Sequence, residues 1–152
     1  MKFSIDVLKK LRQDSQAGVA DCRKALEDAN GDFDKAKKLL GERGLEKAAK
    51  KEGKETSQGI IASYVHANGK VGVLVELRCE TDFVARTDEF KALAHEMTLQ
   101  IAAMNPKNVE ELLKSDYIRD TKLTMQALIK LSIAKLGENI TVSKFTRMTL
   151  GE

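Results

Sequence analysis

The side chains that could perform chemistry are few, and they are scattered along the chain. The histidines are His66 and His95, and neither has a second metal ligand at a close, helix-compatible spacing. The cysteines, Cys22 and Cys79, form no CxxC pair, and a thiol needs an adjacent base to act as a nucleophile. We therefore expect both cysteines to be reduced and packed in a core, and we expect no metal centre.

Other kinds of reactive or nucleotide-binding site are also missing. The chain has neither a GxxxxGK[ST] phosphate loop nor a GxGxxG turn. No pair of carboxylates stands in an apolar setting that would tune one of them as an acid. With no tryptophan, five phenylalanines and two tyrosines, platforms for stacking bases are scarce. These features favour a binding protein over a hydrolase or transferase, and we expect no cofactor and no nucleic-acid ligand.

Composition places the chain among ordinary globular proteins. It has 152 residues, of which 42% are hydrophobic and 32% charged, with a net charge of +3. No apolar run approaches the roughly 20 residues that a bilayer-spanning helix requires, so no membrane contact is expected. The N-terminus mixes charged and apolar residues and lacks the features of a secretory signal or a transit peptide. The expected location is therefore the reducing cytoplasm.

The first third of the chain has the periodicity of helices. Apolar residues recur at helical spacing in residues 3–13, 19–29 and from residue 33 to a stop at Arg43-Gly44. This predicts a three-helix bundle as a first domain, residues 1–45. Residues 46–58 are almost wholly polar and are interpreted as a solvated linker, helical at most at its start. The alternative is a basic tail that touches RNA.

The remaining residues, 59–152, predict an α+β domain. Two β-branched runs flank Ala67-Asn68-Gly69, the pattern of a β-hairpin. Thr87 can cap a helix whose apolar stripe ends at Met104. We expect a three-stranded antiparallel sheet with helices on one face. The expected elements are strands 59–66 and 70–79, helix 88–104, an irregular stretch or short helical turn at 107–120, helix 121–136 and strand 139–150.

Phe83 admits two interpretations. It lies seven residues before Phe90, so one continuous helix would place both rings in the same buried stripe. Thr81 and Thr87, however, both resemble helix starts. A short separate turn between them would let the ring of Phe83 project outward.

The segment that contains Phe83 resembles the signature of the elongation factor Ts family. Residues 79–86 read CETDFVAR. The family's N-terminal module is similar to AGVADCRKALEDANGD at residues 17–32. Its hairpin and its helix-to-strand segment resemble HANGKVGVLVEL at 66–77 and AKLGENITVSKF at 134–145. Four signatures occur in the family's order and together span most of the chain.

This resemblance implies a fold and a set of contacts. The first three helices would form a bundle like a ubiquitin-associated domain that docks on elongation factor Tu, and Asp82 and Phe83 would reach its Mg²⁺ and GDP site to promote exchange. A plain RNA- or ribosome-binding module is the alternative. The matching contact positions are Thr81, Asp82, Phe83 and Val84 in the core, Arg12, Val19 and Ala20 in the bundle, and the weaker positions His66, Leu136 and Gly137.

Departures from the family pattern lie in both parts of the chain. Val19-Ala20 replace a usual Met-Met pair, which leaves a smaller apolar contact. Most of a helical stretch that usually follows Pro106 is missing. Single-core members of the family tend to pair, so the resemblance leaves a homodimer open, with the sheet as one half of it.

Overall fold

The computed structural model describes residues 2–66 and 68–152, which divide into two compact units. The helical unit ends at Lys50, and the sheet unit runs from Lys51 to Glu152. No helix in these described ranges is long and apolar enough to cross a membrane. Each unit is considered by itself below.

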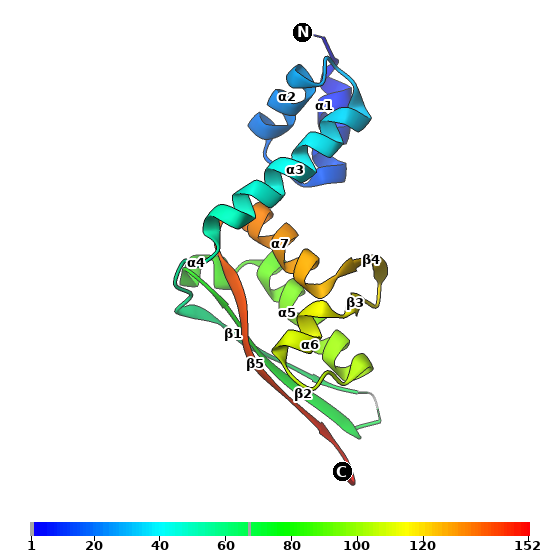
Figure 1. Ribbon diagram of the computed structural model, residues 1–152, viewed down its shortest axis with the longest axis vertical. Helices are drawn as coiled ribbons and strands as arrows, with labels where there is room; N and C mark the ends of the chain where they lie inside the picture. Colours follow the sequence, from blue (N-terminus) through cyan, green and yellow to red (C-terminus); the bar gives the residue numbers. More distant parts are fainter. Residues whose placement is uncertain (1, 67) are drawn as a thin grey trace. The chain divides into compact units, whose positions relative to one another are not determined.

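The helical unit consists of three helices, α1 (Ile5–Ser15), α2 (Val19–Asp28) and α3 (Phe33–Lys51) (Figure 1). The Ser4 hydroxyl caps α1 by accepting a hydrogen bond from the Val7 amide at 3.3 Å. Asn30 and Gly31 end α2 with φ angles of 55° and 85°. A Cβ on Gly31 would lie 2.4 Å from the Lys2 carbonyl oxygen, so only glycine fits there. The buried side chains of this unit include Leu11, Cys22, Ala25, Leu26, Ala29, Ala36 and Leu40.

The third helix is longer than the sequence predicts. We expected a stop at Arg43-Gly44, but the helix continues to Lys51 and takes in the start of the predicted linker. A glycine inside a helix costs only about 1 kcal/mol relative to alanine, and good helix formers follow it. The Lys47 ammonium also lies 2.9 Å from an Asp21 carboxylate oxygen, which ties the extension to α2.

The sheet unit is built on three antiparallel strands in the order β1-β2-β5, as the sequence predicts. The strands are β1 (Gln58–Val65), β2 (Val71–Cys79) and β5 (Ile140–Thr149). The predicted hairpin is confirmed, since β1 pairs with β2 from Gln58 opposite Cys79 to Val65 opposite Gly72. Of its predicted turn, Ala67 lies outside the described residues. The pairing of β2 with β5 shifts register between Glu76 and Leu77, where Ser143 of β5 is left without a partner in β2.

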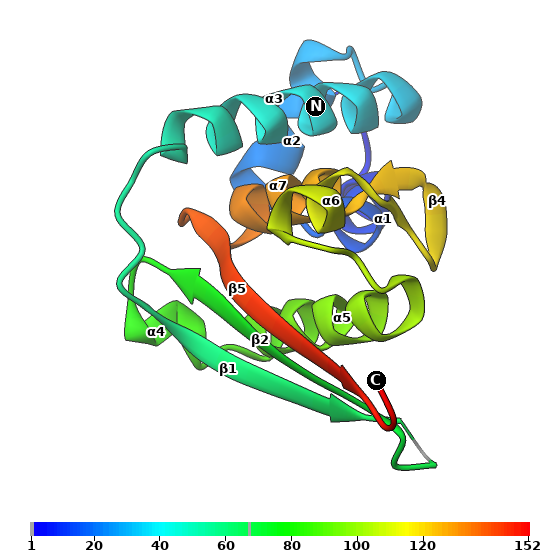
Figure 2. The same cartoon turned by 60° about the horizontal axis from the view of Figure 1, so that its bottom comes forward.

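Three helices lie on one side of this sheet, α5 (Asp88–Met104), α6 (Val109–Lys114) and α7 (Met125–Leu136) (Figure 2). The Thr87 hydroxyl caps α5 through the Phe90 amide at 3.2 Å. The predicted stripe is buried except for Met104, which is 52% exposed because it stands in the last turn, beyond the sheet contact. The main buried side chains of this core are Val73, Val75, Leu77, Phe90, Leu93, Met97, Ile101 and Met125.

The short helical turn that we allowed within residues 107–120 is α6, and a small hairpin that we did not predict follows it. Its strands are β3 (Asp116–Tyr117) and β4 (Asp120–Thr124), so α7 begins at Met125 rather than at residue 121. The buried Gln100 of α5 holds the hairpin, donating to the Asp116 carbonyl at 2.8 Å and accepting from the Ile118 amide at 3.0 Å. Tyr117 donates to Glu96 at 2.8 Å, and burial followed by this contact raises the pKa of Tyr117 to about 12. These contacts join segments too far apart for periodicity to indicate.

Candidate partner-binding site

Phe83 lies on a turn of the chain between β2 and α5. It stands on the four-residue helix α4 (Asp82–Ala85) and is 83% exposed. Phe90, seven residues later, is fully buried. Of the two interpretations of Phe83, the separate outward turn is therefore the one that the structure adopts.

Two threonines set the boundaries of α4. Thr81 has extended backbone angles, φ −125° and ψ 152°, and its hydroxyl accepts from the Val84 amide at 3.3 Å. Thr87 donates its hydroxyl to the Val84 carbonyl at 2.7 Å and starts α5. Each threonine therefore acts as an N-cap, and the chain changes direction between them. This local chemistry keeps Phe83 out of the stripe to which Phe90 belongs.

The inner side of α4 anchors it to the core. Val84 is 7% exposed and Ala85 is 1% exposed. The resemblance groups Val84 with the contact positions, whereas the structure places its side chain inside the protein's own core. Its role in the fold is to fix the turn, because a buried valine contributes roughly 1.5–3 kcal/mol when it leaves water. Thr81, Asp82 and Phe83 form the exposed side.

The charges beside Phe83 are paired but solvated. Asp82 and Arg86 form an ion pair one turn apart, with 56% and 79% of their side chains exposed. A pair this exposed contributes little to stability, on the order of 0–1 kcal/mol. A shallow hollow is lined by these two residues together with Phe83 and Thr87. The surface thus offers one aromatic ring with a carboxylate and a guanidinium beside it.

The end of α7 meets α4 in this structure. Gly137 ends α7 with φ 78° and donates its amide to the Ile133 carbonyl at 2.8 Å. The next residue, Glu138, accepts hydrogen bonds from both the amide and the hydroxyl of Thr81. The structure therefore brings the predicted positions Leu136 and Gly137 close to Thr81. Sequence analysis missed Glu138, since nothing in its local pattern indicates a partner 57 positions away.

A second shallow groove lies between α5 and α7. Leu136, which is half-buried, forms part of its lining. Its other lining residues are Asp88, Glu89, Ala92, Ser132 and Lys135. The groove extends the exposed surface from the predicted position Leu136 toward the start of α5.

His66 lies at the other end of the sheet. It follows β1, where Val65 pairs with Gly72, whereas α4 follows β2 beyond Cys79. Eight residues of strand separate these ends, roughly 25 Å at about 3.3 Å per residue. The exposed His66 ring is held by the Tyr64 hydroxyl, 3.2 Å from its Nδ1 atom. The structure does not bring His66 together with Asp82 and Phe83.

In the helical unit, Arg12, Val19 and Ala20 flank the loop between α1 and α2. Arg12 lies in the last turn of α1, and Val19 and Ala20 open α2. All three side chains are exposed, with Val19 at 47%. The loop thus gathers one cation and two small apolar groups on a local surface.

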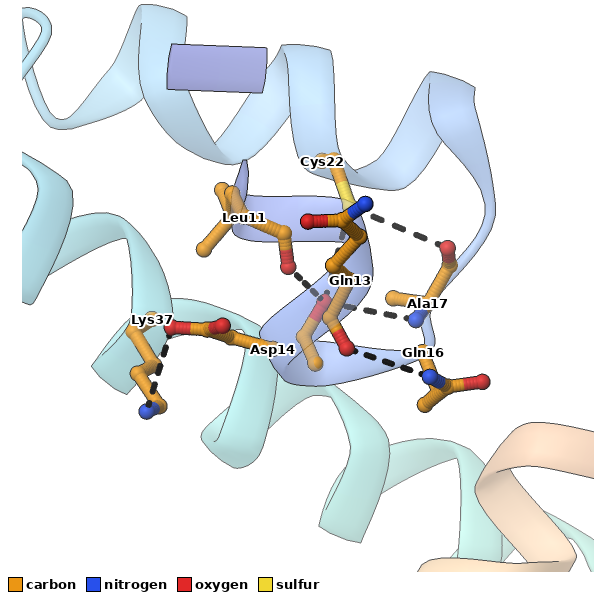
Figure 3. A network of polar contacts seen from close by, with 8 residues as sticks. Leu11, Gln13, Asp14, Gln16, Ala17, Cys22 and Lys37 are labelled. Carbon is orange, nitrogen blue, oxygen red and sulfur yellow. Dashed lines mark hydrogen bonds and ion pairs between the residues drawn. The ribbon is translucent and has the colours of Figure 1, made fainter. Parts of the chain in front are cut away.

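A network of partly buried polar contacts holds this loop (Figure 3). The Ser15 hydroxyl donates to the Leu11 carbonyl at 2.7 Å and accepts from the Ala17 amide at 3.3 Å. Gln16 adopts a left-handed conformation, φ 59°, and its side chain donates to the Gln13 carbonyl at 3.1 Å. The buried Cys22 thiol completes the network beside Ala17. Cys22 therefore has a packing role, as expected.

The remaining groups that could perform chemistry are possible metal ligands and the Cys79 thiol. The described residues contain no group of three or more His, Cys, Asp or Glu side chains arranged to hold a metal. Cys79 is buried and donates its thiol to the Thr81 carbonyl at 3.1 Å. Burial, followed by the nearby Glu138 charge, raises the pKa of the Cys79 thiol and keeps it protonated. Cys79 thus supports the start of α4 and is not poised as a nucleophile.

Comparisons with known proteins show the family of this chain. A family model described as Elongation factor TS matches residues 80–152. Relatives named Elongation factor Ts include those of Fervidobacterium nodosum, 42% identical, and Coprothermobacter proteolyticus, 43% identical. Each alignment is 197 positions long and includes the whole of both chains. That of Thermotoga maritima is 42% identical over 195 residues, covering all of this chain and 98% of its own. Since this chain has 152 residues, part of each relative has no counterpart here.

Proposed function

The chain belongs to the elongation factor Ts family, and we propose that it is a guanine nucleotide exchange factor that binds elongation factor Tu carrying GDP and promotes GDP release. The observation that carries this proposal is the exposure of Phe83 on a braced turn beside Asp82. A large apolar ring held 83% in solvent contributes nothing to its own core and is available to a partner.

The exchange reaction follows from linkage. A GTPase holds GDP through Mg²⁺ and a loop of backbone amides. A protein that binds the nucleotide-free form more tightly must weaken nucleotide binding by the same factor. Insertion of Asp82 and Phe83 near the Mg²⁺ and phosphate site would favour that form. No covalent chemistry is involved, and this chain itself does not bind the nucleotide.

The binding free energy that one phenylalanine can supply is too small, so a second contact region is required. Burying one phenylalanine is worth about 1.5–3 kcal/mol, or roughly a ten- to 150-fold change in an equilibrium constant. Phe83 alone therefore cannot supply a larger shift and also offset the distortion of the partner. We assign the additional binding energy to Arg12, Val19 and Ala20 in the helical unit, whose exposed side chains would form a docking surface. The proposed place of action is the cytoplasm.

We also propose that two copies pair through the sheet face that α5 does not cover. This face exposes Ile61, Val65, Leu74 and Met148, on all three strands. In a two-fold interface each copy presents the same patch, so these apolar side chains would meet their own equivalents. Sedimentation equilibrium measures this. The wild-type chain should have the apparent mass of a dimer, and the Leu74→Asp variant should have that of a monomer. A monomeric wild type rejects the pairing.

Release of a fluorescent GDP analogue from elongation factor Tu tests the exchange proposal. Adding the wild-type chain should accelerate release, and Phe83→Ala should remove most of the acceleration. Met104→Ala, which also truncates an exposed apolar side chain of the sheet unit, is the matched control and should retain it. No acceleration by the wild type would reject the proposal. Binding to RNA instead, with affinity falling steeply with salt, would support the RNA-binding alternative.

A further inference from the structure

A carboxylate distant in the sequence, that of Glu138, binds the N-cap residue of the turn that presents Phe83. The Thr81 amide donates to Glu138 Oε1 at 2.9 Å, and the Thr81 hydroxyl donates to Glu138 Oε2 at 2.7 Å. Both oxygens of one carboxylate are thus used on one residue. Hydrogen bonds to a charged acceptor are the stronger kind, and two in parallel also fix direction.

This contact completes a helix cap that the local sequence cannot complete. In a capping box, the residue three positions after the N-cap returns a side chain to the N-cap amide. Here the N-cap is Thr81, and the residue at that position is Val84, which has no polar group. Glu138 supplies the missing acceptor from the α7–β5 junction.

The same contact orients the threonine hydroxyl. A hydroxyl has one proton to donate. Because Thr81 gives that proton to Glu138, its oxygen lone pair is free to accept from the Val84 amide at 3.3 Å. Glu138 therefore sets both polar groups of the cap. This matters because α4 has four residues, and so short a helix is not stable by itself.

The loop that carries Glu138 is itself held in place. The Asn139 amide donates to the Glu80 carboxylate at 2.6 Å, and the Asn139 side chain donates to the Lys54 carbonyl at 2.8 Å. Asn139 is 6% exposed, so these bonds are partly shielded from water. The backbone beside Glu138 is therefore held in place, and the hydrogen bonds from Thr81 to Glu138 can restrain α4 in turn.

We infer that Glu138 is a positioning residue for exchange, which locks the cap of α4 and so fixes the direction in which Phe83 projects. This inference rests on the proposed function, in which Phe83 is the group that enters the partner. It predicts that loss of Glu138 acts only through Phe83.

A fluorescent reporter tests the inference without any partner. The chain has no tryptophan, so Phe83→Trp gives a single indole at the site. In this background, Glu138→Ala should increase the fast motion of the indole in time-resolved anisotropy. Glu110→Ala, which removes an exposed glutamate paired with Lys114 on α6, is the matched control and should leave it unchanged. Equal indole motion with and without Glu138 would overturn the inference.

A double-mutant cycle in the GDP-release assay tests the functional half. Glu138→Ala should reduce the acceleration about five-fold in the wild-type background and should add no further loss when Phe83 is already alanine. Glu138→Gln keeps one acceptor oxygen and should recover part of the exchange rate. If Glu138→Ala does not fold, Glu138→Gln takes its place in the cycle. Losses that multiply in the double variant would overturn the inference. If the wild type shows no exchange, the proposed function fails, and the anisotropy result still decides whether Glu138 fixes the turn.

Discussion

The two candidate contact surfaces are built in different ways. In the helical unit, Val19 and Ala20 lie on a regular helix, and neighbours within a few residues hold the loop before them. In the sheet unit, Phe83 stands on a four-residue turn that depends on Glu138. A docking surface needs only exposed area, and local structure can supply that. A group that must enter a partner's site needs a fixed direction, which long-range contacts provide.

The largest contrast concerns the two phenylalanines of the sheet unit. Phe90→Ala should lower the free energy of unfolding by about 3–5 kcal/mol, because it empties a fully buried position. Phe83→Ala should change it by less than about 0.5 kcal/mol, because the ring is exposed. Urea unfolding followed by circular dichroism measures both. If Phe83→Ala lowered the free energy of unfolding by more than about 1 kcal/mol, the ring would support its own fold. The proposed difference between Phe83 and Phe90 would then be wrong.

The next effect should separate docking from exchange. Val19→Asp places a charge in the proposed apolar contact and should weaken partner binding about ten-fold while leaving the exchange rate at saturation unchanged. The helix tolerates the change, since Val19 is the first residue of α2 and an acid is favourable there. Measuring exchange against concentration separates the two quantities.

Ile5→Asp is the matched control for that experiment. Ile5 is also the first residue of a helix in the same unit, and it is 60% exposed. Its substitution should leave the concentration dependence as it is. Equal weakening by both variants would indicate a general effect of charge and not a docking surface at Val19.

A smaller gain is expected from enlarging the docking surface. Replacing Val19 and Ala20 by methionine adds flexible apolar area at exposed positions. Partner binding should tighten about three-fold, because part of the added area leaves water on docking and side-chain ordering offsets the rest. Calorimetric titration with elongation factor Tu measures this. Unchanged or weaker binding would place these two positions outside the contact.

The smallest effect should come from the ion pair beside Phe83. Arg86→Ala removes the partner of Asp82, but both side chains are largely exposed. Exchange should change by no more than about two-fold, because exposed ion pairs one helical turn apart contribute about 0.3–0.5 kcal/mol. A loss as large as that of Glu138→Ala would show that the surface pair, and not the cap, holds the turn.

Much of the fold could be predicted from short-range patterns. The hairpin at residues 58–79, the Thr87 cap and most of the α5 stripe follow from turn chemistry and helical spacing, and the structure confirms them. The end of α3 could not be predicted, because the glycine penalty at Gly44 is smaller than the combined preference of the residues after it and the contact of Lys47 with Asp21. The β3–β4 hairpin was missed because Gln100 and Glu96, on a distant helix, determine it.

For the candidate site, the sequence by itself determined the residue types: two capping threonines, an aromatic ring between them and a family signature around it. Only the tertiary structure decided that Phe83 faces solvent, that Val84 belongs to the core and that Glu138 holds Thr81. The physical reason is the range of the interactions. Caps and periodicity act within a few residues, whereas burial and the Glu138 contact depend on how α7 and β5 return to the end of β2.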